Sequence, residues 1–595
     1  MPTPKPPSVT NEPRRLPAWG PLAVVVFGVV VLGANLGGGR VLTYHEAVIT
    51  QPAREMVATG DWLVPTFGGV VFPDKPPLAS WLVAGSALLF GGFDEAVVRF
   101  PAVLAAVVAA VTVAVLGAEL CGRTVGLVAG FVQLTSYWTL MQGRLAEPDM
   151  PLCACVTVAM AAFCRGVIFR TDPDEPFSPR AKVTFLAASG LAFLAKGPIA
   201  LAFIGGGIGL YVVLTRRWST AGFLLSPVGW AVFLAATVGW PAGAYFSRPE
   251  IFDGWLTHNL GRFGGDLPGE QDPWTYATAL PLLLLPWLPF TIGGGVSVVR
   301  TVGGEHSTRR EAWKFFACWT MFGLCLLQAA AFKHKHYLLP VLPPLSLLSA
   351  SGLVAWSRVT WRTSFVPGLL ATSIVGAVVA VCLTSEELRP GLGVAVATPL
   401  SIVAVGGTAA LFAGRFGAWR WHLGLGLGTA AAVAAAVQTQ VLPRFDSYRD
   451  QAVFAGRVGR LVPEGRAVSV VGLPESQIMC YLPVDSPRVD DPEAFRKVLD
   501  EADRDDGEAP SVYSVMPRRL AEDFIADGGG RVLDRCDSVR KREAEGDRLT
   551  LVGFFGPANG PLVTSGADTP ARLPPRPLRV VAAPELLTPP GSAIR

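Results

Sequence analysis

Apolar runs long enough to cross a lipid bilayer recur along most of this chain, and they limit its fold more than any other feature. Hydrophobic residues make up 51% of the 595 positions and charged residues only 16%, whereas a soluble domain is about one-quarter charged. Inside a bilayer, a single segment satisfies its own backbone hydrogen bonds only as a helix. The sequence therefore predicts a polytopic α-helical membrane protein.

Residues 18–442 are predicted to form a domain of about thirteen transmembrane helices. The expected crossings are 18–36, 99–117, 124–141, 150–168, 183–196, 198–214, 221–241, 276–297, 313–331, 337–356, 365–384, 396–414 and 421–440. The shorter apolar run 78–92 is more typical of an interfacial or re-entrant helix.

Lysines and arginines concentrate in alternate loops, which orients the predicted bundle. If residues 1–17 are cytoplasmic, six loops rich in these cations all fall on the cytoplasmic side, as the positive-inside rule requires. The remaining loops and the C-terminal part are then external. We therefore expect a multi-pass inner (plasma) membrane protein with a periplasmic C-terminal domain. The net charge of +4 is small for this length and gives no sign of a nucleic-acid partner.

The composition changes after Leu442. Residues 443–556 alternate helical patterns (448–461, 492–503 and 517–527) with the short apolar runs AVSVVG, SVYSVM, GRVLDR and LTLVGFF. This alternation predicts a small extracytoplasmic α/β domain. Cys480 and Cys536 fall within it and are candidates for a disulfide. Residues 557–595 contain many prolines and no periodicity, which predicts a disordered tail.

Unusual clusters of polar residues gather in the loops predicted to be external. They are His45-Glu46, Asp74-Lys75, the stretch Arg144 to Asp149, Lys196, the stretch His258 to Asp272, and Lys333 to Tyr337. Lysine and arginine can hold a phosphate, and a carboxylate or imidazole can accept a proton. Each residue alone has a simpler explanation as an interfacial anchor or helix cap. Their convergence on one membrane face indicates transfer from a phosphorylated lipid.

The loop after the first apolar run resembles that of known enzymes. The order HEA…AREM-x-x-TGDWLVP…KPPL-x-x-W is similar to the first external loop of lipid-linked sugar transferases of the GT-C superfamily, which include the protein O-mannosyltransferases and the lipid A aminoarabinose transferase. The resemblance continues through RLAEPDMPL, AKGP, HNLGRF and KHYLLPVLPPLSLL, and covers roughly residues 18–350. It implies transfer of a sugar, with inversion, from a polyprenyl-phosphate donor to a lipid, glycan or protein acceptor at the periplasmic face.

The resemblance also implies which residues bind the donor phosphate. Lys75 and Lys196 match the lysines of the family that lie at this phosphate. Arg262, Lys335 and Tyr337 are further expected phosphate contacts.

Asp149 falls at the second acidic motif of the family and is expected to be catalytic, with Arg144 and Glu147 in support. A divalent metal has been placed in the aminoarabinose transferase near the acid before KPP and a histidine of the long loop. Asp74 and His258 would be the matching ligands here.

One departure from the family concerns the expected catalytic acid. Aligned on Ala53-Arg54-Glu55, the leading Asp-Glu pair of the family becomes His45-Glu46. Glu46 then serves as the base, or His45 does so as a neutral imidazole, or the chain has lost activity.

Two other functions remain open. A multi-pass transporter or lipid flippase would also be polytopic, but it should place ionisable residues at mid-span along a substrate pathway. Here the charges gather at one side. A non-catalytic glycan-binding paralogue would be consistent with the histidine at position 45.

Overall fold

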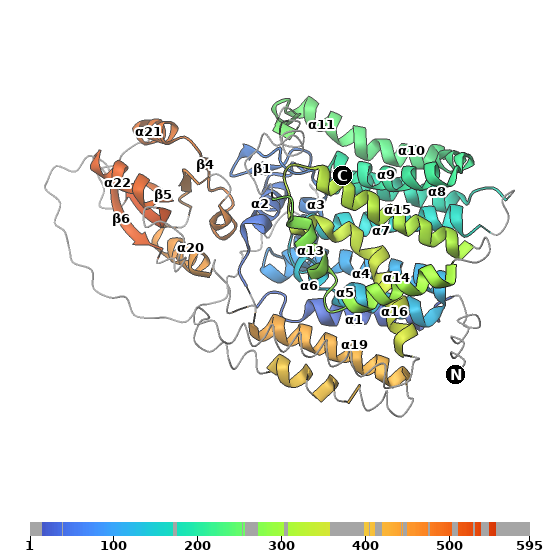
Figure 1. Ribbon diagram of the computed structural model, residues 1–595. Helices are drawn as coiled ribbons and strands as arrows, with labels where there is room; N and C mark the ends of the chain where they lie inside the picture. The colour runs from blue at the N-terminus through green and yellow to red at the C-terminus, as the bar shows by residue number, and fades with distance from the viewer. Residues whose placement is uncertain are drawn as a thin grey trace, which may run out of the picture.

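The computed structural model describes two stretches of the chain (Figure 1). These are residues 15–357 except 39, 171–174, 253, 256, 258–271 and 303–307, and residues 398–554 except 404, 408, 411–418, 442, 444–448, 464, 474–475, 502–509, 528–529 and 537–546. The crossing expected at 365–384, both ends of that at 396–414, the tail 557–595, and His258 and Arg262 lie outside the described residues.

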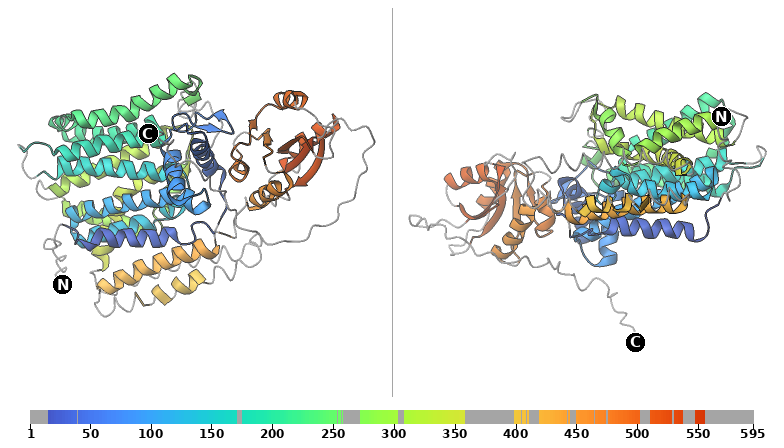
Figure 2. Two further views of the ribbon diagram at one scale, coloured as in Figure 1. Left: turned by 180° about the vertical axis from the view of Figure 1, so that it is seen from behind. Right: turned by 60° about the horizontal axis from the view of Figure 1, so that its bottom comes forward.

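A bundle of helices makes up most of the molecule, and a small domain that contains a β-sheet lies at one end of it (Figures 1 and 2). The helices of the bundle part are α1 (Trp19–Gly33), α2 (Tyr44–Thr59), α3 (Leu78–Phe90), α4 (Glu95–Cys121), α5 (Arg123–Thr135), α6 (Tyr137–Gln142), α7 (Asp149–Phe163), α8 (Pro179–Lys196), α9 (Pro198–Thr215), α10 (Pro227–Leu234), α11 (Trp240–Ser247), α13 (Thr275–Leu283), α14 (Leu288–Val302), α15 (Thr308–Ala329), α16 (Leu342–Ser357) and α19 (Trp419–Ala436).

Six expected crossings are long and apolar enough to span a membrane in the described part of the chain. They are Glu95–Cys121, Asp149–Ile168, Pro198–Thr215, Pro227–Ser247, Thr308–Ala329 and Lys335–Ser357. Four other expected crossings correspond to helices that are shorter or more polar. They are α1, the consecutive pair α5 and α6, α8, and α19. The run 78–92 forms α3, whose 13 residues are too few to cross a bilayer.

The crossing predicted at 276–297 is not one continuous helix. Two helices, α13 and α14, replace it and meet at an angle of 91°. Pro286 lies in the break between them, where its missing N–H and its ring disfavour a continuous helix. This pair is either a seventh, broken crossing or a re-entrant loop.

Small residues allow the helices of the bundle to approach closely. A β-carbon at Gly126 of α5 would collide with the backbone carbonyl oxygen of Ala114 in α4. Without a hydrophobic driving force between helices in lipid, such close backbone packing supplies much of the attraction. The α4–α5 pair therefore requires glycine at this position.

The small domain contains a five-stranded mixed sheet in the order β4-β3-β5-β7-β6. The strands are β3 (Val468–Val471), β4 (Arg488–Val489), β5 (Val512–Pro517), β6 (Gly530–Arg535) and β7 (Leu549–Phe554), and the helices are α20 (Arg449–Leu461), α21 (Pro492–Glu501) and α22 (Arg518–Ala526). Strand β3 is parallel to β4 and β5, whereas β7 is antiparallel to β5 and β6. Four of these strands and all three helices coincide with predicted elements. The two-residue β4 is too short for alternation to indicate it.

Hydrogen bonds connect the small domain to α2 and to the hairpin formed by β1 (Thr66–Phe67) and β2 (Val70–Val71). The Arg54 guanidinium, on α2, donates to the carbonyl oxygens of Met479 and Leu482 at 2.8 and 2.9 Å. The backbone N–H of Arg488 donates to the carbonyl oxygen of Gly68 at 3.0 Å. The small domain therefore rests directly on the first loop after α1.

The candidate disulfide is not formed, because Cys480 and Cys536 are both free thiols. Cys480 lies against α2, with its Sγ 3.9 Å from the carbonyl oxygen of Ala47. The adjoining Tyr481 hydroxyl accepts from the backbone N–H of Leu42 at 2.7 Å and donates to Glu95 at 2.9 Å. This segment contacts the bundle instead of bridging to Cys536.

Candidate functional site

One pocket collects polar side chains from five separate segments of the chain, at the end of the bundle where α2 begins. It encloses about 540 Å³ of space, its open mouth included. Its lining consists of Tyr44, His45, Val48, Asp74, Lys75, Glu147, Pro148, Asp149, Lys196, His334, His336 and Tyr337. The structure thus brings together residues up to 293 positions apart in the sequence, counted from Tyr44 to Tyr337.

Asp149 and Lys196 form an ion pair in this pocket. Asp149 is the first residue of α7 and Lys196 the last residue of α8, so the helix dipoles favour each charge at its position. Gly197 has a φ of 73°, which favours glycine, and Pro198 then begins α9. The Lys196 ammonium lies 3.7 Å from the centre of the Tyr337 ring. The Lys-Gly-Pro turn therefore fixes a cation inside the pocket.

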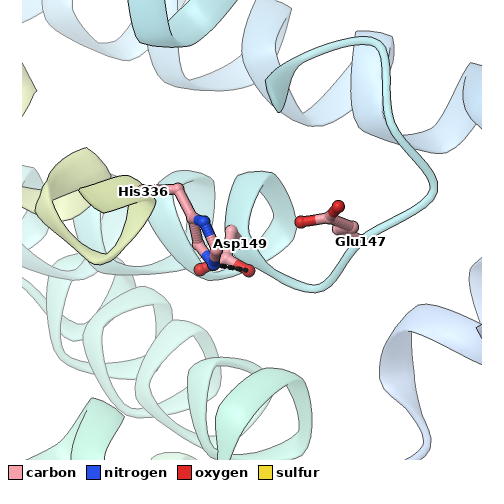
Figure 3. A group of neighbouring side chains, drawn as sticks. All are labelled: Glu147, Asp149 and His336. Carbon is pink, nitrogen blue, oxygen red and sulfur yellow. Dashed lines mark ion pairs between the residues drawn. The ribbon is translucent and has the colours of Figure 1, made fainter. Parts of the chain in front are cut away.

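Glu147, Asp149 and His336 lie close enough to be tested as a metal site (Figure 3). One ligand atom from each lies within 4.8 Å of the others, and His336 Nε2 is 3.8 Å from Asp149 Oδ2. However, Lys196 already compensates Asp149, and burial together with Asp149 and Glu46 raises the pKa of Glu147 to about 8. At neutral pH the Glu147 carboxyl is mainly protonated. Hard divalent cations need ionised oxygen ligands, so the Glu147 carboxyl would have to release its proton to bind one.

Three imidazole rings line the pocket. The ring centres of His45 and His334 are 6.1 Å apart, and His334 stacks on His336 with centres 5.1 Å apart. Burial and the nearby charges of His336 and Lys196 lower the pKa of His334 to about 3, so that ring is neutral. His45 is exposed at the pocket, whereas His334 and His336 are half-buried. His45 is therefore the ring most accessible to a substrate.

The sequence did not single out His334 and His336 as site residues. Lys335 and Tyr337 were expected from the same segment, but Lys335 is exposed and does not line the pocket. Residues Lys335–Val341 form a 3₁₀-helix, in which residues three apart share one side. This spacing groups His334 with Tyr337, and it is the signal that could have identified His334.

Glu46 is fully buried and is bound within the protein instead of lining the pocket. Its carboxylate accepts from Arg99 Nε and Nη2 at 2.7 and 3.1 Å and from the backbone N–H groups of Thr43 and Ala146 at 2.9 and 3.2 Å. The Thr43 hydroxyl in turn accepts from the Glu46 backbone N–H, which completes a capping box for α2. Burial alone would raise the pKa of Glu46, but Arg99 and the backbone donors outweigh it and lower that pKa. This geometry favours a structural role over that of a catalytic base.

A second carboxylate, Glu55 of α2, binds the hairpin that follows α2. It accepts from the backbone N–H groups of Gly68 and Gly69 at 2.6 and 3.2 Å and from the Thr66 hydroxyl at 2.6 Å. These residues form the turn of the hairpin β1 (Thr66–Phe67) and β2 (Val70–Val71), in which both glycines have positive φ. The chain then leads directly to Lys75. The AREM motif therefore shapes the loop that presents this lysine.

Arg144, expected to support the site, lies outside this pocket. Its guanidinium donates to the carbonyl oxygens of Leu32 and Asn35 and to Gln438 Oε1. Because His258 is outside the described residues, the Asp74–His258 metal pair stays a prediction, as does the phosphate contact of Arg262.

Comparisons of sequence agree with the resemblance in the first loop. The profile of the family described as dolichyl-phosphate-mannose-protein mannosyltransferase matches residues 74–240. Undecaprenyl phosphate-alpha-4-amino-4-deoxy-L-arabinose arabinosyl transferases from Edwardsiella ictaluri and Aeromonas hydrophila are 28% and 30% identical over 357 and 308 residues. These matches cover 57% and 51% of this chain, and 59% and 54% of the two relatives. The chain thus spans less than two thirds of the length of these curated relatives.

Comparison of structure extends the likeness to most of the chain. The crystal structure of ArnT from Cupriavidus metallidurans bound to undecaprenyl phosphate superposes with a TM-score of 0.70, at 18% identity, over 91% of this chain and 100% of that one. The two chains share one fold. The predicted resemblance to GT-C transferases is confirmed by these sequence and structural matches.

Proposed function

We propose that this chain is an integral-membrane glycosyltransferase that moves a sugar from a polyprenyl-phosphate donor to a lipid, glycan or protein acceptor at the external membrane face. The observation that carries the proposal is the single pocket in which two lysines lie beside an exposed histidine. The aminoarabinose transferases named above, and the ArnT bound to undecaprenyl phosphate, support a lipid-linked donor.

Lys75, Lys196 and Tyr337 are the proposed contacts for the donor phosphate. The Asp149 carboxylate and the Tyr337 ring hold Lys196 in place. When the bond between the sugar C1 and the phosphate oxygen breaks, the electron pair stays on that oxygen. Preformed cations stabilise this developing charge most effectively in a site that excludes water.

His45 is the proposed general base. The acceptor hydroxyl oxygen attacks C1 from the side opposite the leaving phosphate, so the anomeric configuration inverts, and its proton passes to a ring nitrogen of His45. Glu46 cannot reach the proton without leaving Arg99. Glu147, mainly protonated at neutral pH, would donate a hydrogen bond to a substrate oxygen. No step is assigned to a divalent metal; if one binds, Glu147, Asp149 and His336 are the residues that would hold it.

The proposed orientation in the membrane is based on the lysines and arginines of the loops. We propose that residues 1–17 are cytoplasmic, and that the pocket and the small domain (443–556) are periplasmic. The small domain lies at the same end of the bundle as α2 (Figure 1), which supports placing both on one side of the membrane.

The test is release of free lipid phosphate by the purified protein from undecaprenyl-phosphate sugars, including 4-amino-4-deoxy-L-arabinose. Lys75→Ala should abolish release, whereas Lys497→Ala, an exposed lysine of the small domain, should leave it unchanged. Release that survives Lys75→Ala would refute the assigned phosphate contact. Transport of intact donor across vesicles would indicate a flippase, and donor binding without turnover a glycan-binding paralogue.

A further inference from the structure

A second polar pocket is lined by Arg99 of the Glu46–Arg99 ion pair, and we call it the arginine pocket. It encloses about 410 Å³ of space, its open side included. Its lining consists of Asn35, Leu36, Arg40, Arg99, Leu140, Met141, Arg144, Leu145 and Gln438. These residues lie after α1, in and just after α6, at the start of α4, and in the helical turn Val437–Val441 that follows α19. One end of α19 lies near the small domain in Figure 1. The lining holds three guanidinium groups and no carboxylate among the described residues.

Arg144 is a buried cation with neutral partners. Arg144 is only 9% exposed. Its guanidinium donates to two backbone carbonyl oxygens and to Gln438 Oε1. Within the described part of the chain, Arg144 makes no salt bridge to a carboxylate. Burial and the charge of Arg99 lower the pKa of Arg144 to about 10, so the guanidinium remains charged at neutral pH. A buried charge without a counterion is costly, which indicates that an anion belongs beside it.

Gln438 supplies an independent indication. It is 2% exposed, its Oε1 accepts from Arg144 Nη1 at 3.1 Å, and its Nε2 has no hydrogen-bond partner among the described residues. Buried amide groups are nearly always satisfied. An anion with several acceptor oxygens would satisfy this Nε2 and compensate Arg144 together. By contrast, Arg99 lines the pocket but is already paired with Glu46.

The arginine pocket adjoins a larger apolar cavity. The two share Leu140, Met141 and Gln438. The apolar cavity encloses about 1790 Å³, its open side included, and its lining contains Trp287 and Phe290 with many leucines, valines and alanines. Cationic and donor groups at the edge of a hydrocarbon-lined space match a molecule with an anionic head and long apolar chains.

We propose that Arg40, Arg144 and Gln438 bind the phosphate headgroup of a membrane lipid whose chains enter the apolar cavity. This site is separate from the donor-phosphate pocket of Lys75 and Lys196, and it does not depend on the proposed transferase reaction. Arg99 lines the arginine pocket and pairs with Glu46 of α2, which places the lipid next to α2.

The experiment measures lipid binding to delipidated, detergent-solubilised full-length protein by native mass spectrometry. Three probes are compared: dioleoyl phosphatidylglycerol, dioleoylglycerol, which lacks the phosphate, and inorganic phosphate. Phosphatidylglycerol should bind the wild-type protein at least about tenfold more tightly than dioleoylglycerol, since charge-assisted hydrogen bonds are the strong ones. Arg144→Gln should remove that preference, whereas Arg123→Gln, the same change at an exposed arginine, should keep it.

Two further variants separate the sites and guard against misfolding. Gln438→Leu removes the unsatisfied amide without changing the charge, and it should weaken phosphatidylglycerol binding. Lys75→Ala should leave it intact even where transferase activity is lost. Equal binding of phosphatidylglycerol and dioleoylglycerol, loss of binding on Lys75→Ala, or thermal stabilisation by inorganic phosphate as large as that by the lipid would each overturn the proposal.

Discussion

Removing the charge of Glu46 separates its structural role from the catalytic role that the sequence allowed. In Glu46→Gln the single amide oxygen can accept from Thr43 or from Ala146 but not from both, because these two N–H groups bind different oxygens of the Glu46 carboxylate. Arg99 also loses its anionic partner. Both side chains are nearly inaccessible, with 0% exposure for Glu46 and 5% for Arg99. Breaking a buried pair by removing one partner costs about 3–5 kcal/mol. We expect a loss of stability of this size.

The assay is a denaturant titration of the detergent-solubilised protein, combined with turnover of the donor lipid by the fraction that remains folded. A double-mutant cycle with Arg99→Gln isolates the pairing energy, because contacting residues couple whereas distant ones add. Folded Glu46→Gln protein should retain most of its activity. A variant of unchanged stability that has lost turnover would refute the structural assignment and restore Glu46 as the base.

Three other perturbations test the site. His45→Ala should lower kcat about 10²–10⁴-fold. His45→Asp should retain part of the activity, and the acidic limb of its pH–rate profile should move to lower pH. If both variants keep the wild-type profile, His45 is excluded as the base. The raised pKa of Glu147, about 8, means that the folded state holds a proton the unfolded state releases, so stability should fall by about 1.4 kcal/mol per pH unit between the unfolded pKa and about pH 8. Glu147→Gln should remove that slope and keep activity, and an inactive Gln variant would make Glu147 the base. Arg54→Ala removes two hydrogen bonds to the small domain. Proteolysis after residue 441 should then be faster than in the wild-type protein at the same temperature. An unchanged cleavage rate would show that other contacts are enough to hold the small domain in place.

Patterns along the chain predicted most of the elements because they depend on local chemistry. The strands and helices of the small domain follow from alternation and helical periodicity, and the helix ends at Lys196 and Asp149 from glycine, proline and charge. The bend at Pro286 was missed because the apolar run continues through it. Hydropathy registers composition, and a broken helix has the same composition as a straight one.

The residues of the pocket were predicted less completely, since roles there depend on distant partners. Glu46 was one of two candidates for the base, with His45, because the pair matches the Asp-Glu pair of the family, but its partner Arg99 lies 53 positions away. A sequence shows which charges exist and not which of them neutralise one another. His334 and His336 were not listed as site residues because a histidine beside lysines has the pattern of an interfacial anchor.

Helix α2 is a continuous rod of 16 residues, about 24 Å long at 1.5 Å per residue. His45 is at its first turn, and the anchor of the small domain, Arg54, is nine positions further on. A displacement of the small domain that Arg54 follows would therefore shift the helix that carries His45. If His45 is the base, as proposed, a macromolecule bound to the small domain would alter the rate of sugar transfer without contacting the pocket.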